Sequence, residues 1–212
     1  MNKAVFVFLM VVLSSCSVAT RDQSVNLTAT ATMSKIGDGG FLSGVPCGPP
    51  CFFGVVPRTT SKDQVIKLLQ SDELYLVCQE YDTRAEGGPR GINCGSVDVG
   101  LQKDLDIVEQ IAFQPPQTIT VNQVLAKYGK PSAIGVATLG SIEPNEPITN
   151  MLLLYDTLGV SLGLVKQNSA VFDVEPTTLI KNIGYLDQSA YNTVRQYSQK
   201  WNGYGTYQES NP

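Results

Sequence analysis

The chain has 212 residues, a formal net charge of −4 and no histidine, and only 16% of its residues are charged. Its length suffices for one sizeable core or for two small repeats that share a core. The acidic balance and the lack of a Lys- or Arg-rich run exclude a typical nucleic-acid-binding surface. The lack of histidine excludes Ser-His-Asp and Cys-His catalytic sites and most zinc and copper sites. We therefore expect no cofactor and no metal.

The first fifteen residues are typical of a signal peptide. Lys3 supplies a positive charge, and the apolar run from Ala4 to Leu13 is too short to span a membrane. The next residues, Leu13-Ser-Ser-Cys16, resemble the lipobox of bacterial lipoproteins, whose cysteine receives lipid and becomes the new N-terminus. The alternative is an ordinary secretory signal in which Cys16 is incidental. We favour lipidation of Cys16, which predicts an extracytoplasmic lipoprotein anchored to the cell membrane or the outer membrane.

Residues 16–44 are predicted to form a flexible tether. They are rich in Thr, Ser, Ala and Gly and poor in large apolar side chains, as in Thr28–Thr32 and Gly37–Gly40. Such a composition buries too little surface to offset the entropy of ordering. The folded domain is expected over residues 45–207, followed by a short tail at 208–212.

Two helices are predicted from the same local pattern. Thr120 and Gln123 have the spacing of a capping box before a helix of about 120–128, and Gly129 and Pro131 end it. The opening recurs in Ser61-Lys-Asp-Gln-Val, which predicts a helix from about 61 to 70.

The remaining elements suggest a duplicated unit, with unit one at about 58–117 and unit two at about 118–186. Strands are predicted over 74–81, 92–101, 107–113, 133–139, 151–155, 160–166 and 179–185, and a third helix over about 189–200. The predicted fold is α+β: two tandem helix-plus-three-strand units form one antiparallel sheet, with helices on one face and a C-terminal helix. The other face would be open to water or a partner.

Four cysteines remain after Cys16, an even number that favours two disulfides in an exported chain. Three pairings are possible. We favour Cys78–Cys94, because these residues lie on predicted neighbouring strands, and this leaves Cys47–Cys51 as a tight local loop. The Cys47-Gly-Pro-Pro-Cys51 segment has three intervening residues and no predicted helix, so a structural disulfide is favoured over a redox-active one.

The run Thr120-x-x-Gln-Val-x-x-x-x-Gly-x-Pro131 resembles the motif of small outer-membrane assembly lipoproteins of the SmpA/BamE type. The duplicated arrangement is similar to the tandem fold of β-lactamase inhibitor protein. Pro46-Cys47, Phe52–Pro57 and Trp201–Tyr207 also resemble uncharacterised bacterial lipoproteins with this plan. The resemblance implies tandem αβββ repeats over about 45–207. It departs from the assembly lipoproteins, which have a single unit, and the first helix lacks the Gly-x-Pro ending. It implies a fold and not an activity.

No residue is predicted to be catalytic. The carboxylate pairs Asp104/Asp106 and Glu143/Glu146 lie in predicted turns or loops, where solvated charge is the ordinary explanation. The aromatic residues are expected mainly in the core, among them Tyr128, Tyr155, Tyr185 and Trp201.

We expect a non-enzymatic protein that is tethered to the membrane by its N-terminal lipid. It would bind a protein partner, as an envelope scaffold or an inhibitor, with no role for nucleic acid. The sequence does not identify the partner-binding residues. The alternative is a thiol–disulfide exchange protein that uses Cys47 and Cys51. A third possibility is a carboxylate-based hydrolase of wall glycans.

Overall fold

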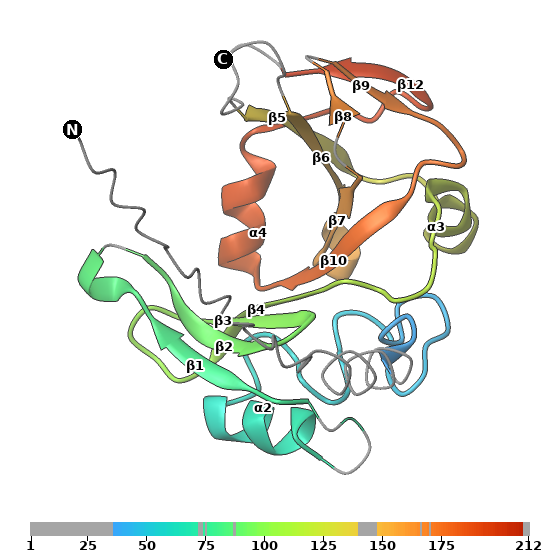
Figure 1. The fold of residues 1–212 in the computed structure, drawn as a ribbon. Helices are drawn as coiled ribbons and strands as arrows, with labels where there is room; N and C mark the ends of the chain where they lie inside the picture. The colour runs from blue at the N-terminus through green and yellow to red at the C-terminus, as the bar shows by residue number, and fades with distance from the viewer. Residues whose placement is uncertain are drawn as a thin grey trace, which may run out of the picture.

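The computed structural model describes residues 36–71, 74, 76–86, 88–139, 148–165, 167–169 and 171–209 (Figure 1). The elements follow in chain order. They are α2 (Lys62–Leu69), β1 (Gln79–Asp82), the 3₁₀ helix η1 (Arg84–Glu86), β2 (Arg90–Cys94), β3 (Val97–Leu101), β4 (Val108–Phe113), α3 (Val121–Tyr128), β5 (Ala133–Leu139), β6 (Ile148–Tyr155), the 3₁₀ helix η2 (Asp156–Leu158), β7 (Val160–Leu164), β8 (Gln167–Asn168), β9 (Val171–Val174), β10 (Ile180–Leu186), α4 (Gln188–Arg195), β11 (Ser198–Gln199) and β12 (Gly205–Gln208).

Ten strands form one antiparallel sheet. Its order is β1-β2-β3-β4-β10-β7-β6-β5-β11, with β8 paired to β6, while β9 and β12 form a separate two-stranded sheet. The two halves of the large sheet meet where β4 pairs with β10, with Phe113 opposite Ile183 and Ile111 opposite Tyr185. The chain is therefore mostly β, and the predicted α+β fold of two tandem helix-plus-three-strand units is wrong.

Two features break the predicted repeat. Gly95 adopts a φ of 72° and turns the chain, so the single strand predicted over 92–101 is a hairpin of β2 and β3. Between β7 and β10 the chain forms two more strands, β8 and β9, where none was predicted. The number of strands and their order consequently differ between the two halves.

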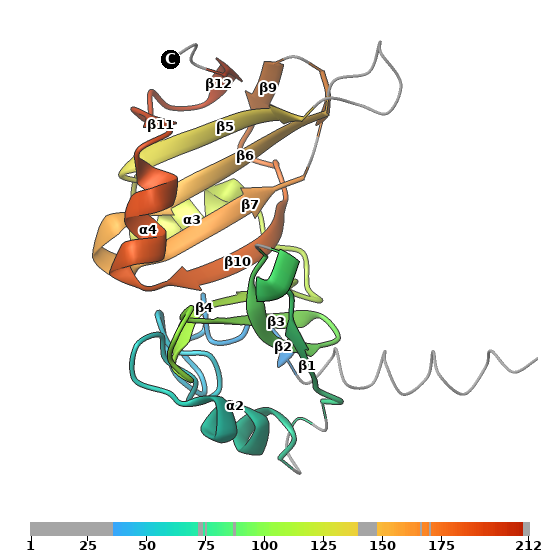
Figure 2. The same cartoon turned by 90° about the vertical axis from the view of Figure 1, so that its left-hand side faces the viewer.

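The helices lie on both faces of the sheet, which also contradicts the prediction. Along β6, Met151, Leu153 and Tyr155 point into the main core, to which α2 and α3 contribute their buried side chains. The alternate residues Leu152 and Leu154 face the other way and pack with α4. Figures 1 and 2 show α3 and α4 on opposite sides of the strands.

The capping signals in the sequence do form the predicted helix starts. Thr120 and Gln123 make a reciprocal capping box at the start of α3, and Ser61 and Gln64 make another at α2. Gly129 ends α3 with a φ of 76°. Local chemistry thus determines where these helices begin, although it did not reveal the arrangement of the sheet.

The folded part begins before the predicted boundary. Residues 36–44, which were assigned to the 16–44 tether, form a turn whose Ile36 and Phe41 side chains are buried in the main core. The Asp38 carboxylate stabilises this turn by accepting hydrogen bonds from backbone N–H groups two to five residues ahead. Side-chain bonding to the turn and two buried apolar residues offset the entropy that the glycines lose on ordering.

The main core contains an aromatic chain that links the two halves. The rings of Phe52 and Phe113 lie 4.5 Å apart, and those of Phe113 and Tyr185 lie 5.7 Å apart. Tyr185 is completely buried, and its hydroxyl has no hydrogen-bond partner within the described part of the chain. Burial raises the pKa of this phenol. A buried hydroxyl without a hydrogen-bond partner destabilises the folded state, so the Tyr185 hydroxyl lowers the free energy of unfolding.

We therefore expect Tyr185→Phe to raise the free energy of unfolding by about 1 kcal/mol, because it removes an unsatisfied group and keeps the ring. Tyr155→Phe is the matched control, since the Tyr155 hydroxyl donates to the Gly129 carbonyl at 3.1 Å. Its loss should lower the free energy of unfolding by about 1 kcal/mol. Urea denaturation measures the free energy of unfolding of both variants. If both substitutions lower it, the Tyr185 hydroxyl has a hydrogen-bond partner.

Candidate functional site

The structure pairs Cys47 with Cys51 and Cys78 with Cys94, with S–S distances of 2.13 and 2.05 Å. This is the pairing favoured from the sequence. The disulfides indicate an oxidising, extracytoplasmic environment. No helix within the described ranges is long and apolar enough to cross a membrane. Cys16 lies outside the described residues.

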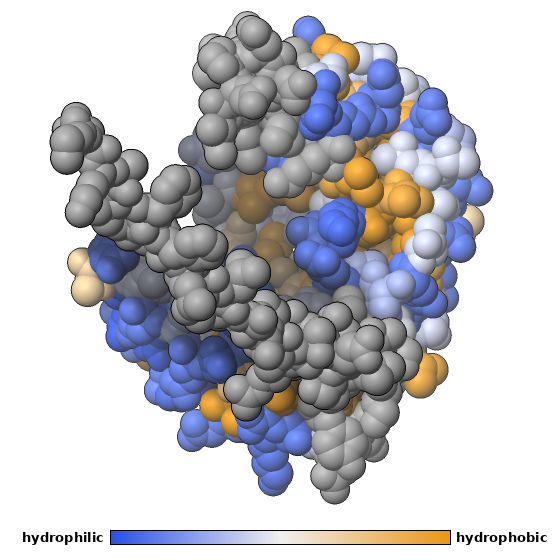
Figure 3. Space-filling view, in the orientation of Figure 1, coloured by the Kyte–Doolittle hydropathy of each residue, from blue (hydrophilic) through white to orange (hydrophobic). Residues whose placement is uncertain are grey.

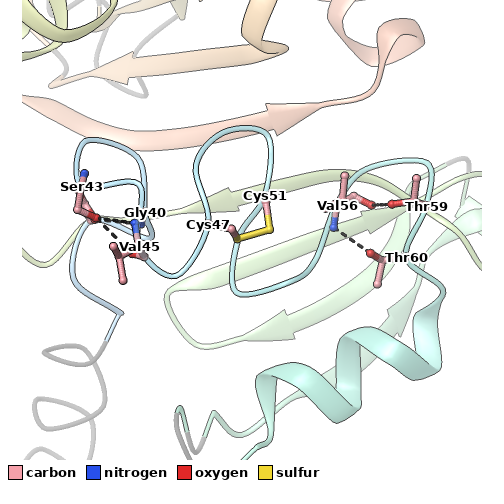
Figure 4. The surroundings of a disulfide bond; sticks show 9 residues. Gly40, Ser43, Val45, Cys47, Cys51, Val56, Thr59 and Thr60 are labelled. Atoms are coloured by element: carbon pink, nitrogen blue, oxygen red, sulfur yellow. Dashed lines mark hydrogen bonds between the residues drawn. A yellow bond between two sulfur atoms is a disulfide. The ribbon is translucent and has the colours of Figure 1, made fainter.

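The Cys47–Cys51 disulfide lies in a loop beside the turn that contains Gly40 and Ser43 (Figure 4). The chain continues into a tight turn in which Phe52 and Val55 exchange backbone hydrogen bonds. Neither sulfur lies at the N-terminus of a helix, the position that usually lowers a thiol pKa in redox-active pairs. This environment favours a structural disulfide.

The carboxylate candidates do not form a recognisable catalytic pair. Asp104 and Asp106 are both exposed, and Asp106 accepts a hydrogen bond from Arg90. Glu143 and Glu146 lie outside the described residues. Among the residues that the structure describes, no cluster of three or more His, Cys, Asp or Glu side chains could hold a metal ion.

A groove of about 390 Å³ lies between α4 and the strands β5 and β6, on the face of the sheet opposite α3. We call it the α4 groove. Its lining consists of small, apolar and uncharged polar residues, namely Gly135, Val136, Ala137, Asn150, Leu152, Thr193, Val194 and Tyr197. Figure 3 shows recessed hydrophobic residues near the position of α4, between hydrophilic ones.

The sheet supplies the floor of the groove. Gly135 lies opposite Leu152 in the pairing of β5 with β6, and Ala137 lies opposite Asn150. All four therefore point to the α4 side of the sheet. The small residues on β5 leave space that larger side chains would fill, and this space is the groove.

Tyr197 forms the outer wall of the groove. It follows α4, precedes β11 directly and is 75% exposed, the most exposed aromatic residue in the described part of the chain. Tyr197 lies within the helix predicted over about 189–200, at helical spacing from Tyr191 and Val194, which are buried and half-buried. The spacing suggested a common face, but the end of α4 at Arg195 separates Tyr197 from that face.

The N-terminus of α4 is fixed by a buried carboxylate. Asp187 accepts hydrogen bonds from the backbone N–H groups of Ser189 and Ala190, both at 2.8 Å. It also accepts from the Arg58 side chain at 3.2 Å, and its own side chain is only 2% exposed. Arg58 adopts a positive φ of 67°, which is unusual for a residue with a side chain. Arg58, from the first half of the chain, thus helps to fix the start of α4, the helix that forms one side of the groove.

The far end of α4 is held independently. The Tyr191 hydroxyl donates to the Asp156 carboxylate, and the Arg195 guanidinium lies 3.8 Å from the same group. Tyr191 and Val194 pack against Ala133 and Leu154 of the sheet. Because both ends of α4 are fixed, the groove is present before any ligand binds.

Two carboxyl groups near the start of α4 have shifted pKa values. Burial opposes ionisation of Asp187, but the hydrogen bonds from Ala190, Arg58 and Ser189 outweigh it and lower the pKa. Burial and the nearby Asp187 charge raise the pKa of Glu109. Ionised Asp187 is therefore the form that the fold stabilises.

No protein-family model matches the chain, and the searches of curated proteins and of solved structures found no match either. The resemblance to SmpA/BamE-type lipoproteins and to β-lactamase inhibitor protein therefore stays a hypothesis.

We expect Asp187→Asn to lower the free energy of unfolding at neutral pH by about 1 kcal/mol, because it removes the charge at the helix N-terminus and the Arg58 pair. A lowered folded-state pKa stabilises the fold above the unfolded-state pKa of about 4 and loses this effect as the pH falls through the folded-state value. The difference in the free energy of unfolding between wild type and variant should therefore shrink below about pH 4. Denaturation at pH 7, 5 and 3 measures this difference, and a difference independent of pH would contradict a stabilising role of ionised Asp187.

Proposed function

We propose that this protein is a lipid-anchored extracytoplasmic binding protein of non-enzymatic type, which holds a protein partner at the α4 groove. One observation carries the proposal: an exposed Tyr197 borders a preformed groove whose described lining residues are all uncharged. Exposed aromatic residues beside apolar pockets are typical centres of protein interfaces.

The composition of the groove favours a protein side chain as its occupant. Leu152 and Val194 provide apolar contact, while Asn150 and Thr193 offer hydrogen bonds at the margin. None of the lining residues that the structure describes is charged, so an apolar side chain can enter without desolvating any of them as an ion. The groove alone is smaller than a stable interface, so it would accept the central anchor of a larger contact.

The location supports the same function. The two disulfides indicate an exported protein, and the Leu13-Ser-Ser-Cys16 sequence supplies a lipidation signal. A lipid at Cys16 would hold the domain close to other envelope proteins. A scaffold and an inhibitor make the same physical demand, namely a rigid surface that binds another protein.

We expect Tyr197→Ala to weaken capture of the protein partner by about thirtyfold, equivalent to about 2 kcal/mol, because it removes the exposed wall of the groove. The measurement is quantitative crosslinking and pull-down from native membranes with lipidated protein. Tyr204→Ala is the matched control, because Tyr204 is 43% exposed but lies outside the groove. Equal loss in both variants, or in neither, would contradict a role for the groove.

The same pull-down distinguishes thiol exchange. A Cys47→Ser, Cys51→Ser double variant that still folds should keep the partner. Thiol exchange would instead be favoured by two results together: the wild type holds its partner as a mixed disulfide that reduction releases, and the double variant no longer captures this partner.

We expect Cys16→Ser to move the protein from the membrane fraction to the soluble fraction, because the lipid attachment site is lost. Detergent partitioning and mass spectrometry of the mature N-terminus measure the change. A Cys16→Ser variant that stays with the membrane would show that another feature anchors the chain.

A further inference from the structure

The β5 edge of the large sheet is incompletely paired. β11 pairs with β5 only through Ser198 opposite Gly135 and Gln199 opposite Ile134. β5 continues to Leu139, and within the described residues no strand pairs with Val136–Leu139 on that side. These residues therefore present a row of backbone N–H and C=O groups that another extended chain can pair with.

The two edges of the sheet differ in their charge. The outer strand at the other end, β1, carries Glu80 and Asp82, charges that commonly prevent strand addition at an edge. The β5 sequence from Ala133 to Leu139 contains no charged residue and no proline. The uncharged edge is the one that borders the α4 groove.

The unpaired edge and the groove are adjacent. Ala137 belongs to the unpaired stretch and also lines the groove, where its side chain is exposed. Tyr197 directly precedes Ser198, the residue at which β11 begins to pair. An extended chain placed beyond β11 along β5 would thus pass the groove, with alternate side chains directed to the α4 side.

We propose that the partner contributes an extended segment that pairs with Val136–Leu139 and inserts an uncharged apolar side chain into the α4 groove. This inference rests on the proposed function and specifies the form of the partner. Backbone pairing supplies affinity, and the groove selects the side chain, as in recognition by strand addition.

The chemistry of the site favours this occupant. Among its described lining residues the groove has no charged side chain that could hold an ionic ligand, and unpaired strand backbone is complementary to another strand. Because α4 is fixed at both ends, the wall of the groove needs no rearrangement. A second copy of this chain, adding its own β5 edge, is the competing occupant.

The test uses a display library of random twelve-residue peptides, selected on the full-length protein in detergent. We expect selected peptides to share an apolar or aromatic residue within an uncharged stretch. Each peptide is then synthesised in two versions, N-methylated on odd or on even residues. Because alternate N–H groups of a strand point to the same side, one version should bind at least tenfold more weakly and the other should bind nearly normally.

Protein variants test the edge and the groove separately. Ala137→Lys should reduce peptide binding at least tenfold, because it places a charge where the groove meets the edge. Gln79→Lys, at an exposed position on β1, is the matched control and should bind normally. Circular dichroism of both variants establishes that they are folded.

The outcomes separate the two proposals. If Tyr197→Ala weakens the peptides but neither N-methylated version loses affinity, groove binding stands and strand addition is overturned. If neither Tyr197→Ala nor Ala137→Lys weakens them, both proposals fall. If sedimentation shows that the wild type self-associates and Ala137→Lys abolishes this, the occupant is a second copy and the partner segment is overturned.

Discussion

The pairing of β4 with β10 is the constraint on which the rest of the structure depends. It joins strands far apart in the chain and converts two smaller sheets into one. It also brings Phe113 against Tyr185, so the aromatic core continues across the junction. At the end of β10 the chain reaches Asp187 beside Arg58 and Glu109, and there α4 begins. The position of the groove wall is thus set by contacts with the first half.

The sequence predicted local elements well where short-range chemistry determines them. The capping boxes at Ser61 and Thr120 depend on residues three positions apart, and both formed. The predicted fold class was wrong because strand order depends on long-range pairing. The predicted tether was wrong at residues 36–44 for a related reason. Gly37–Gly40 is flexible by composition, but Asp38 and the buried Phe41 order it.

The groove could not be found from the sequence. Its lining comes from β5, β6 and the end of α4, which lie up to about sixty residues apart along the chain and meet only through sheet pairing and helix packing. Gly135 and Ala137 are unremarkable in a strand, and Tyr197 fits a helical spacing. What distinguishes Tyr197 is that α4 ends before it, at Arg195. That end carries no strong signal, since Gln196 is neither glycine nor proline.

The buried turn at residues 36–44 has a mechanical consequence. Phe41 packs on Tyr128, whose hydroxyl donates a hydrogen bond to the Phe41 carbonyl. The turn at residues 36–44 is therefore attached to the C-terminal end of α3. Tension along the chain before Ile36 would therefore act on interior packing and not on a peripheral loop. Extracting Ile36 and Phe41 would expose apolar core surface, so this turn resists a pulling force on the N-terminus with the free energy of core burial.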